Sequence, residues 1–270
     1  MALLRCLPEV AVVGYAHRLK TRNKAMALGH DFEVTGSLQQ AVSQADLVVL
    51  ASPVCTFEAL FKDMAPWLPD QCIVTDVGST KVQIHDWAAK TLPKRVVYVG
   101  SHPMAGSEQS GLEYARDDLF ERALCLVTHR KNTPQWAINT VSALWQTLGC
   151  RVESLQPAQH DRIVARISHV PHVLAASLMN ASSFDDLSYT GKGFVDTSRV
   201  ASGPEEVWTD ILLTNAQHVS KGIDRTIAEL TKLQAAIQTG RRSRVMQLLN
   251  RAREKRVRMI NEKISRKELL

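Results

Sequence analysis

Residues 72–81 read Cys-Ile-Val-Thr-Asp-Val-Gly-Ser-Thr-Lys, a β-branched run that ends in an aspartate and a turn of small residues. Helical spacing of apolar residues follows at once over Lys81–Thr91. Continuous apolar strands that alternate with helices are typical of a parallel sheet covered on both faces. We therefore expect a strand here whose carboxyl end opens at the ligand-binding edge of an α/β sheet.

The same strand-and-helix unit recurs through the first 155 residues. Further β-branched runs occupy residues 10–14, 47–51 and 96–100, with helical stretches between them at 18–28, 38–43 and 57–67. A last strand, helix and strand are expected at 124–128, 136–148 and 151–154. This pattern predicts an α/β domain over residues 1–155, built as a Rossmann-type doubly wound parallel sheet.

Beyond Pro157 the β-branched runs stop. Helical periodicity extends over 160–181, 206–239 and 243–264, and the Gly-, Ser- and Asp-rich segment 182–202 is expected to interrupt it as a loop. We therefore predict an all-helical second domain over residues 156–270. Helices this long in a domain of this size often pack against a symmetry mate, so we expect a homodimer through the helical domain.

The composition is that of an ordinary globular protein: 270 residues, of which 45% are hydrophobic and 22% charged. No apolar run approaches the roughly 18 residues of a membrane helix, and residues 1–20 lack the order of a signal peptide, so we expect a cytoplasmic protein that does not bind membranes. The five cysteines are widely spaced and never form C-x-x-C. This spacing predicts neither a disulfide framework nor a zinc site.

The net charge of +6 is concentrated at the end of the chain. Residues 241–270 carry eleven Lys/Arg against three Glu, a net charge of +8, which leaves −2 for the other 240 residues. Apolar residues in this tail keep a helical spacing, so we interpret it as a helix with a solvated basic face. A contact with an acidic partner or nucleic acid is the less favoured interpretation.

The cofactor side of the predicted sheet is incomplete. No G-x-G-x-x-G turn is present, and Met1–Pro8 resembles the last turns of a helix. Taking residues 10–14 as the second strand of a Rossmann unit resolves this difficulty. The chain is then expected to begin inside the first helix, without about 20–30 residues that would supply the first strand and the phosphate loop.

The residues after that strand are Tyr15-Ala16-His17-Arg18. No carboxylate is present for the ribose 2′-hydroxyl of NAD, whereas Arg18 offers positive charge to a 2′-phosphate, which favours NADP while leaving NAD possible. A plain solvated start of a helix is the alternative interpretation. The expected cofactor-binding residues, each near the end of a predicted strand, are His17, Arg18, Ser52, Pro53 and Asp76.

Histidines and an arginine supply candidate chemistry. His102 follows a predicted strand among small residues and suits a general base near neutral pH, although a lone histidine there is more often structural. His169 and His172 stand three residues apart on one helical face, but Pro171 and the lack of a third ligand argue against metal, so we expect none. Arg199, in the Gly/Ser-rich segment, suits a bidentate clamp for a carboxylate.

Several motifs together identify a resemblance. GSHPMAGSE (100–108), DVGSTK (76–81), ISHVPH (167–172) and GFVDTSRVAS (193–202), followed by W-x-D-I-x-x-x-N from Trp208, resemble the prephenate/arogenate dehydrogenase family in spacing and order. The resemblance covers nearly the whole chain. It implies an NAD(P)-binding Rossmann domain followed by a helical dimerisation domain, and oxidative decarboxylation of prephenate or arogenate in tyrosine biosynthesis.

The resemblance also implies roles for matched positions. His102 would hydrogen-bond the ring hydroxyl of the substrate as the base, Ser79 would orient that histidine, and Arg199 would bind a substrate carboxylate beside His172. Further positions expected to shape or gate the substrate site are Glu108, His160, Asp196 and Trp208. The chain departs from the family at the absent glycine-rich loop and at Ala16, which replaces the usual acidic residue.

Two other functions fit parts of the pattern. A different two-domain NAD(P) oxidoreductase would share the architecture, but such enzymes usually use a catalytic lysine in the helical domain, where this chain concentrates histidines and an arginine. A non-catalytic paralogue that binds a small dicarboxylate would explain the missing phosphate loop. Nucleotide binding separates this second alternative from the dehydrogenase.

Overall fold

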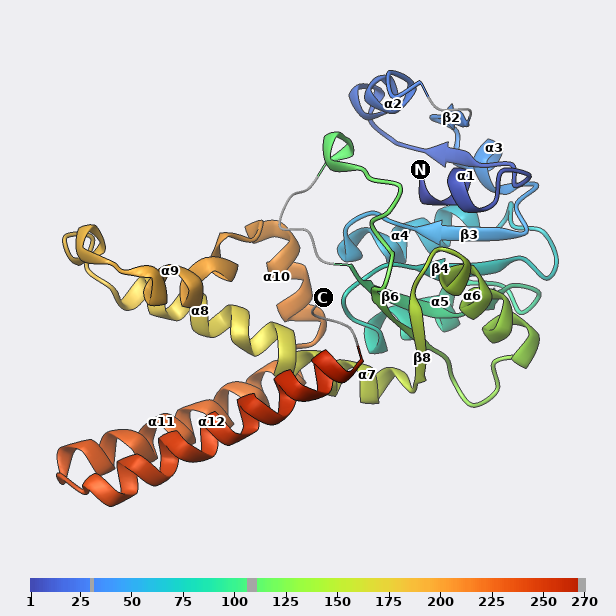
Figure 1. Cartoon of the computed structure of the whole chain (residues 1–270). Coiled ribbons are helices and arrows are strands. Elements are labelled where there is room, and N and C mark those ends of the chain that lie inside the picture. Colours follow the sequence, from blue (N-terminus) through green and yellow to red (C-terminus); the bar gives the residue numbers. More distant parts are fainter. Residues whose placement is uncertain (30–31, 106–110, 267–270) are drawn as a thin grey trace. The chain divides into compact units, whose positions relative to one another are not determined.

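The computed structural model describes residues 1–29, 32–105 and 111–266, drawn in Figure 1. The chain divides into two compact units, Met1–Ala216 and Gln217–Leu270. The strands are β1 (Val13–Tyr15), β2 (Glu33–Thr35), β3 (Leu47–Leu50), β4 (Ile73–Asp76), β5 (Val97–Tyr98), β6 (Gly100–Met104), β7 (Leu124–Thr128) and β8 (Arg151–Leu155). The helices of the first unit before residue 156 are α1 (Ala2–Cys6), α2 (Leu19–Met26), α3 (Leu38–Val42), α4 (Phe57–Met64), α5 (Val82–Thr91) and α6 (Gln135–Thr147).

The sheet pairing explains where the site lies. Strands β3, β4 and β5 pair in parallel, and β7 and β8 also pair in parallel. Around Val99 the chain changes partner, because β5 pairs with β4 whereas the next strand, β6, pairs antiparallel with β7. The sheet is therefore mixed rather than all parallel as expected. A parallel return to β7 would need a helical crossover, and the described part of 105–123 holds only the short 3-10 helix Leu112–Tyr114.

Two apolar layers cover opposite faces of this sheet. Side chains alternate along a strand, so Ile73 and Val74 of β4 point to opposite faces. Val74 packs in a cluster with Phe57, Phe61 and other residues around α4 and α5, whereas Ile73 packs in a second cluster with residues of α1 and α6 such as Trp145. Burial on both faces confirms the doubly wound α/β architecture.

The first two strands form a sheet of their own. β1 pairs in parallel with β2, a three-residue strand that the sequence pattern did not predict, and the two form a separate sheet. Among the described residues, no strand pairs with the other side of β1 or with the outer side of β3.

Helices follow β8. They are α7 (Pro157–Val164), a π-helical turn (Ala165–His169), α8 (Val170–Ala181), α9 (Lys192–Ser198) and α10 (Glu205–Thr214). The π-helical turn leads directly to Pro171, which cannot donate a backbone hydrogen bond. Segment 182–202 was expected to be a loop and instead contains α9 and the 3-10 helices Asp186–Tyr189 and Arg199–Ser202. Its glycines are tolerated because Gly191 precedes α9 as its N-cap and Gly193 lies in the first turn.

The second unit is a helical hairpin. Helix α11 (Ala216–Gln238) is followed by helix α12 (Arg242–Ser265), drawn in orange and red in Figure 1. Gly240, with a φ of 60°, makes the turn between them in a conformation that favours glycine. The basic tail is thus helical as predicted, and α12 has no buried residue. Within the described ranges, no helix is long and apolar enough to cross a membrane.

Candidate active site

A buried ion pair holds the turn after β4. The carboxylate of Asp76 and the ammonium of Lys81 are both fully buried, with Lys81 Nζ 2.6 Å from Asp76 Oδ2. Asp76 also accepts hydrogen bonds from the backbone N–H groups of Gly78 and Ser101 and from the Tyr98 hydroxyl. These contacts join the turn at 77–81 to β6, which carries His102. Asp76 was expected to bind cofactor, but its oxygens are inaccessible and occupied, so its role here is structural.

The start of helix α5 is capped from another helix. Asp161 of α7 accepts the backbone N–H of Lys81 on Oδ1 and that of Val82 on Oδ2, both at 2.8 Å. The Oδ1 atom also lies 2.8 Å from His160 Nδ1, and His160 Nε2 lies 2.9 Å from His102 Nδ1. Asp161, His160 and His102 therefore form a continuous chain, which we call the Asp161–His160–His102 chain. His160 and Asp161 are fully buried, whereas His102 is half-buried.

Burial controls the ionisation of this chain. Burial, with the neighbouring His160 and Lys81, holds the pKa of His102 well below its ordinary value. Burial also lowers the pKa of His160, although Asp161 opposes the shift. For Asp161, burial acts to raise the pKa, but the contacts with His160 and the two backbone N–H groups outweigh it, so the pKa is lowered. At neutral pH the two imidazoles are neutral and the carboxylate is ionised.

A second buried histidine lies nearby. Asn215 Nδ2 donates to the carbonyl of Asp161 at 2.8 Å and lies 3.2 Å from His169 Nδ1. Because that carbonyl can only accept, the nitrogen of the Asn215 amide must face His169, and His169 Nδ1 must accept. The proton of the neutral ring is then on Nε2, which is buried and has no hydrogen-bond partner among the described residues. Burial lowers the pKa of His169 to about 4.

An aromatic pair forms the next part of the site. The His172 ring of α8 stacks on Trp208 of α10, with ring centroids 3.5 Å apart and planes 11° from parallel. The contact depends on Gly203, where a Cβ would come within 2.2 Å of Trp208 Nε1. His172 Nδ1 is buried without a partner in the described part of the chain, and burial lowers the pKa of the ring. The pair is therefore a stacked aromatic contact that contains one buried nitrogen atom, His172 Nδ1.

Helix α10 also contacts two loops of the sheet edge. Asp210 Oδ2 accepts the backbone N–H of Cys55, in the turn after β3, and Thr214 Oγ1 lies 2.9 Å from Thr80 Oγ1. The helix that carries Trp208 is therefore fixed to the turns after both β3 and β4.

The remaining substrate-site expectations differ in outcome. Ser79 is half-buried beside this cluster, but the ring of His102 is held by His160, and no hydrogen bond from Ser79 to it is described. Arg199 and Asp196 are exposed at the end of α9 and the start of the following 3-10 helix. Arg199 directly precedes Val200, whose backbone interacts with His172. Glu108 lies outside the described residues.

His160 was expected to line the substrate pocket. The structure instead places it behind His102 with no exposed surface, where its ring contacts the ring of His102. Asp161, His169 and Asn215 complete the cluster and were not identified as site residues. Two sequence features could have identified them. Asn215 is the last residue of the W-x-D-I-x-x-x-N motif, and His160 and Asp161 are consecutive polar residues at the start of a predicted helix.

The cofactor edge lies at the ends of β1 and β3. His17 and Arg18 are exposed after β1, and Ser52 and Pro53 are exposed after β3, where the Ser52 hydroxyl pairs with that of Thr56. Arg22 does not extend outward with Arg18, because its guanidinium binds the carbonyl groups of Ala16 and His17 and so shapes this turn.

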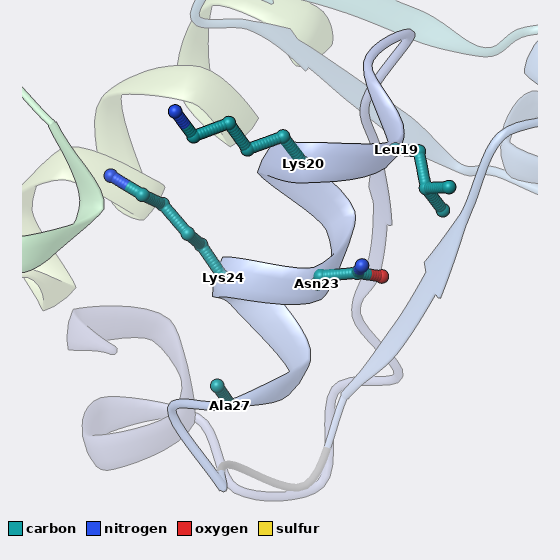
Figure 2. Close-up of a pocket in the computed structure, with 5 residues that line it drawn as sticks. All are labelled: Leu19, Lys20, Asn23, Lys24 and Ala27. Carbon is teal, nitrogen blue, oxygen red and sulfur yellow. The ribbon is translucent and has the colours of Figure 1, made fainter.

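A shallow hollow runs along α2 beside this turn. Figure 2 shows Lys20 and Lys24 extending on the same side of the helix. The lining residues are Leu19, Lys20, Asn23, Lys24 and Ala27. None of the clustered histidines contributes to this hollow, which is a basic surface next to the end of β1 rather than the reaction centre.

No metal site accompanies these histidines. Within residues 1–29, 32–105 and 111–266, no group of three or more His, Cys, Asp or Glu side chains could hold a metal ion.

Comparison with known families matches both parts of the chain. Residues 1–154 match the model of the prephenate dehydrogenase nucleotide-binding domain, and residues 156–251 match that of the prephenate dehydrogenase dimerization domain. Cyclohexadienyl dehydrogenase of Zymomonas mobilis is 35% identical over 237 residues, which cover 85% of this chain and 80% of that protein.

Solved structures are similar over nearly the full length. Prephenate dehydrogenase of Aquifex aeolicus, in complex with hydroxyphenyl propionate and NAD+, superposes with a TM-score of 0.88 at 31% identity, covering 96% of this chain and 92% of that one. Arogenate dehydrogenase of Synechocystis superposes with a TM-score of 0.80 at 26% identity, covering 92% and 91%.

Proposed function

This chain belongs to the prephenate dehydrogenase family, and we propose that it oxidises prephenate or arogenate with NADP at the cluster around His102. The observation that carries this proposal is the Asp161–His160–His102 chain, which leaves a neutral histidine half-buried on the strand that follows the ligand edge of the sheet. A dehydrogenase needs such a group to accept the proton of the hydroxyl that becomes a carbonyl.

The residues of the chain divide the reaction between them. His102 accepts the proton of the ring hydroxyl. A nicotinamide cofactor, held near the turns after β3 and β4, would supply the acceptor for the hydride on the carbon that bears this hydroxyl. The ring carboxylate then leaves as CO₂ and the ring becomes aromatic, so the last step needs little help from an acid. Arg199 binds a substrate carboxylate, and His172 with Trp208 forms the wall of the pocket.

The described residues could contact a nicotinamide dinucleotide at its nicotinamide end and at its adenosine ribose. The turns after β3 and β4 lie at the edge where the nicotinamide is expected, and Ser52, Pro53 and Ser79 are accessible there. The turn after β1 carries Arg18, with no carboxylate between Ala16 and Lys24. We infer that this turn binds a 2′-phosphate, which supports NADP, with Lys20 and Lys24 adding positive charge. No glycine-rich turn is present among these residues for the pyrophosphate.

We further infer a homodimer built through the helical domain, which we take to begin at residue 156, where the second matched family segment starts. In support, the α11–α12 hairpin carries apolar side chains that are more than half exposed: Ile227, Leu230 and Ile237 on α11, and Met246, Leu249 and Val257 on α12. Leu230→Glu should shift the mass in light scattering toward the monomer, whereas Lys232→Glu on the same helix should not.

We place the reaction in the cytoplasm. In support, all five cysteines are free thiols, as is usual in a reducing compartment.

The test of the proposed reaction is turnover of both substrates by the full chain. Reduced cofactor should form from prephenate or arogenate with NADP, and not from simple 2-hydroxy acids. His102→Asn should lower kcat by about 10²–10⁴, the usual effect of losing a general base, and Arg199→Gln should mainly raise KM. Full turnover by His102→Asn would show that another group is the base. Binding of a dicarboxylate without any binding of NADP would favour the non-catalytic paralogue.

A further inference from the structure

The hydrogen atoms of the Asp161–His160–His102 chain can be assigned from its geometry. An ionised carboxylate can only accept hydrogen bonds. Asp161 already accepts two backbone N–H groups at the start of α5, which favour the ionised form. His160 Nδ1 lies 2.8 Å from the same carboxylate, so this nitrogen must carry a hydrogen.

The hydrogen on His160 Nδ1 also fixes the position of the hydrogen on the His102 ring. In a neutral imidazole only one nitrogen carries hydrogen, so His160 Nε2 is an acceptor. It lies 2.9 Å from His102 Nδ1, which must therefore donate. His102 Nε2 is left with its lone pair and no hydrogen. This tautomer is the one that can accept a proton from a substrate hydroxyl.

We propose that His160 and Asp161 are positioning residues that fix this tautomer of His102, and that His160 takes up the Nδ1 hydrogen of His102 during the reaction. The inference rests on the proposed function. As His102 Nε2 accepts the substrate hydroxyl proton, the hydrogen on His102 Nδ1 moves to His160 Nε2. His102 stays neutral and His160 becomes an imidazolium next to the Asp161 carboxylate. The electron pair leaves the substrate as hydride, which the nicotinamide cofactor accepts, so charge and atoms balance.

The groups around the two rings explain why moving the proton from His102 to His160 is favourable. Burial, His160, Lys81 and His169 all disfavour a positive charge on His102. A proton kept on this ring alone would therefore be costly. Around His160, burial and Lys81 also oppose a positive charge, but the Asp161 and Asp76 carboxylates favour it. The positive charge is therefore better accommodated one ring further from the substrate.

Wild-type protein provides the first test. In protein labelled with ¹⁵N-histidine, His102 Nδ1 should show the shift of a protonated nitrogen and Nε2 that of an unprotonated one, with His102→Asn identifying the signals. The opposite tautomer would overturn the proposal. This measurement needs no turnover, so it is independent of the proposed function: a chain that showed the expected tautomer but oxidised neither prephenate nor arogenate would refute only the reaction.

Two variants separate the two roles of His160. His160→Gln places an amide oxygen near the position of Nε2, so it can accept from His102 but cannot take up a proton. His160→Leu can do neither. We expect kcat to fall in both, by about 10²–10⁴ in His160→Leu and less in His160→Gln. KM should change little, because His160 is not exposed to substrate. The His102 tautomer should become mixed in His160→Leu and stay fixed in His160→Gln.

His85 offers a matched control. It is also a buried histidine, in helix α5, but it pairs with Thr128 rather than with the Asp161–His160–His102 chain. His85→Leu should leave kcat within about twofold of wild type once the folded fraction is matched by circular dichroism. A purely packing role for His160 would predict equal losses of kcat in His85→Leu and His160→Leu, and no difference between His160→Gln and His160→Leu.

Discussion

Gly203→Ala tests the contact between Trp208 and His172. The backbone of Gly203, with φ of −63° and ψ of 149°, suits any residue, so strain in the main chain plays no part. The new Cβ would lie 2.2 Å from Trp208 Nε1 and 2.7 Å from Trp208 Cδ1. Ordinary contacts between such atoms are about 3.5–4.0 Å, so the indole must move by about 1 Å or more. That movement breaks its stack on His172.

The expected cost follows from two effects. Forcing an extra carbon into a packed site costs about 1–3 kcal/mol, and losing a stacked aromatic pair costs about 0.5–1.5 kcal/mol. We therefore expect the free energy of unfolding, measured in urea by tryptophan fluorescence, to fall by about 1.5–4.5 kcal/mol. KM for prephenate or arogenate should rise, because Trp208 and His172 form the pocket wall in the proposed function.

Gly191→Ala provides the control for this prediction. Gly191 lies in the same part of the chain, has an ordinary φ of −95°, and has open space where its Cβ would be. Because alanine is a poorer N-cap than glycine, this variant should lower the free energy of unfolding by about 0.5–1 kcal/mol, and it should leave KM unchanged. If Gly203→Ala matched Gly191→Ala in both stability and KM, the stack would not be the contact that this glycine protects.

Three further predictions follow from buried and basic groups. Lys81→Met leaves the Asp76 carboxylate buried without its counter-charge and should lower the free energy of unfolding by about 3–5 kcal/mol in urea; an unchanged midpoint would contradict the ion pair. Burial lowers the pKa of His169 from 6.5 to about 4, so the unfolded chain binds this proton more readily, and stability should fall as the pH drops from 6.5 to about 4. The loss from this residue is up to about 3 kcal/mol, and His169→Gln should remove it from the urea profile. Arg18→Ala should raise KM for NADP about tenfold, as for loss of one charged hydrogen bond, with little effect on KM for NAD; equal effects on both cofactors would exclude a 2′-phosphate contact.

Local patterns account for what the sequence predicted well. The strand expected at 47–51 is β3 (Leu47–Leu50), and the helix expected at 81–91 is α5 (Val82–Thr91). Apolar periodicity indicates which side chains face the core, and both elements pack side chains into the core clusters. β2 was missed because its three residues, Glu33–Thr35, include only one apolar side chain. α9 was missed because Gly193 lowers the helical propensity of its segment.

Residue roles were harder to predict than elements. His102, His172 and Trp208 were expected at the site, and the structure brings them close to the same cluster. Asp76 was assigned to the cofactor because it ends a strand, but pairing with Lys81 buries it. His160 was assigned to the substrate, yet it contacts the base. The direction in which a side chain points depends on neighbours that are distant in sequence.

The DVGST turn at 76–80 and the strand before it determined the α/β architecture from sequence alone, because the alternation of apolar runs and helices is a local property of the chain. The sequence also placed His102 beside a ligand edge. Only the tertiary structure decided which nitrogen of His102 is free. That choice is imposed by Asp161, which is 59 residues away and is itself held by the first N–H groups of α5. A tautomer is set by hydrogen-bond partners in space, and those partners meet only when the helix after β8 packs against the turn after β4.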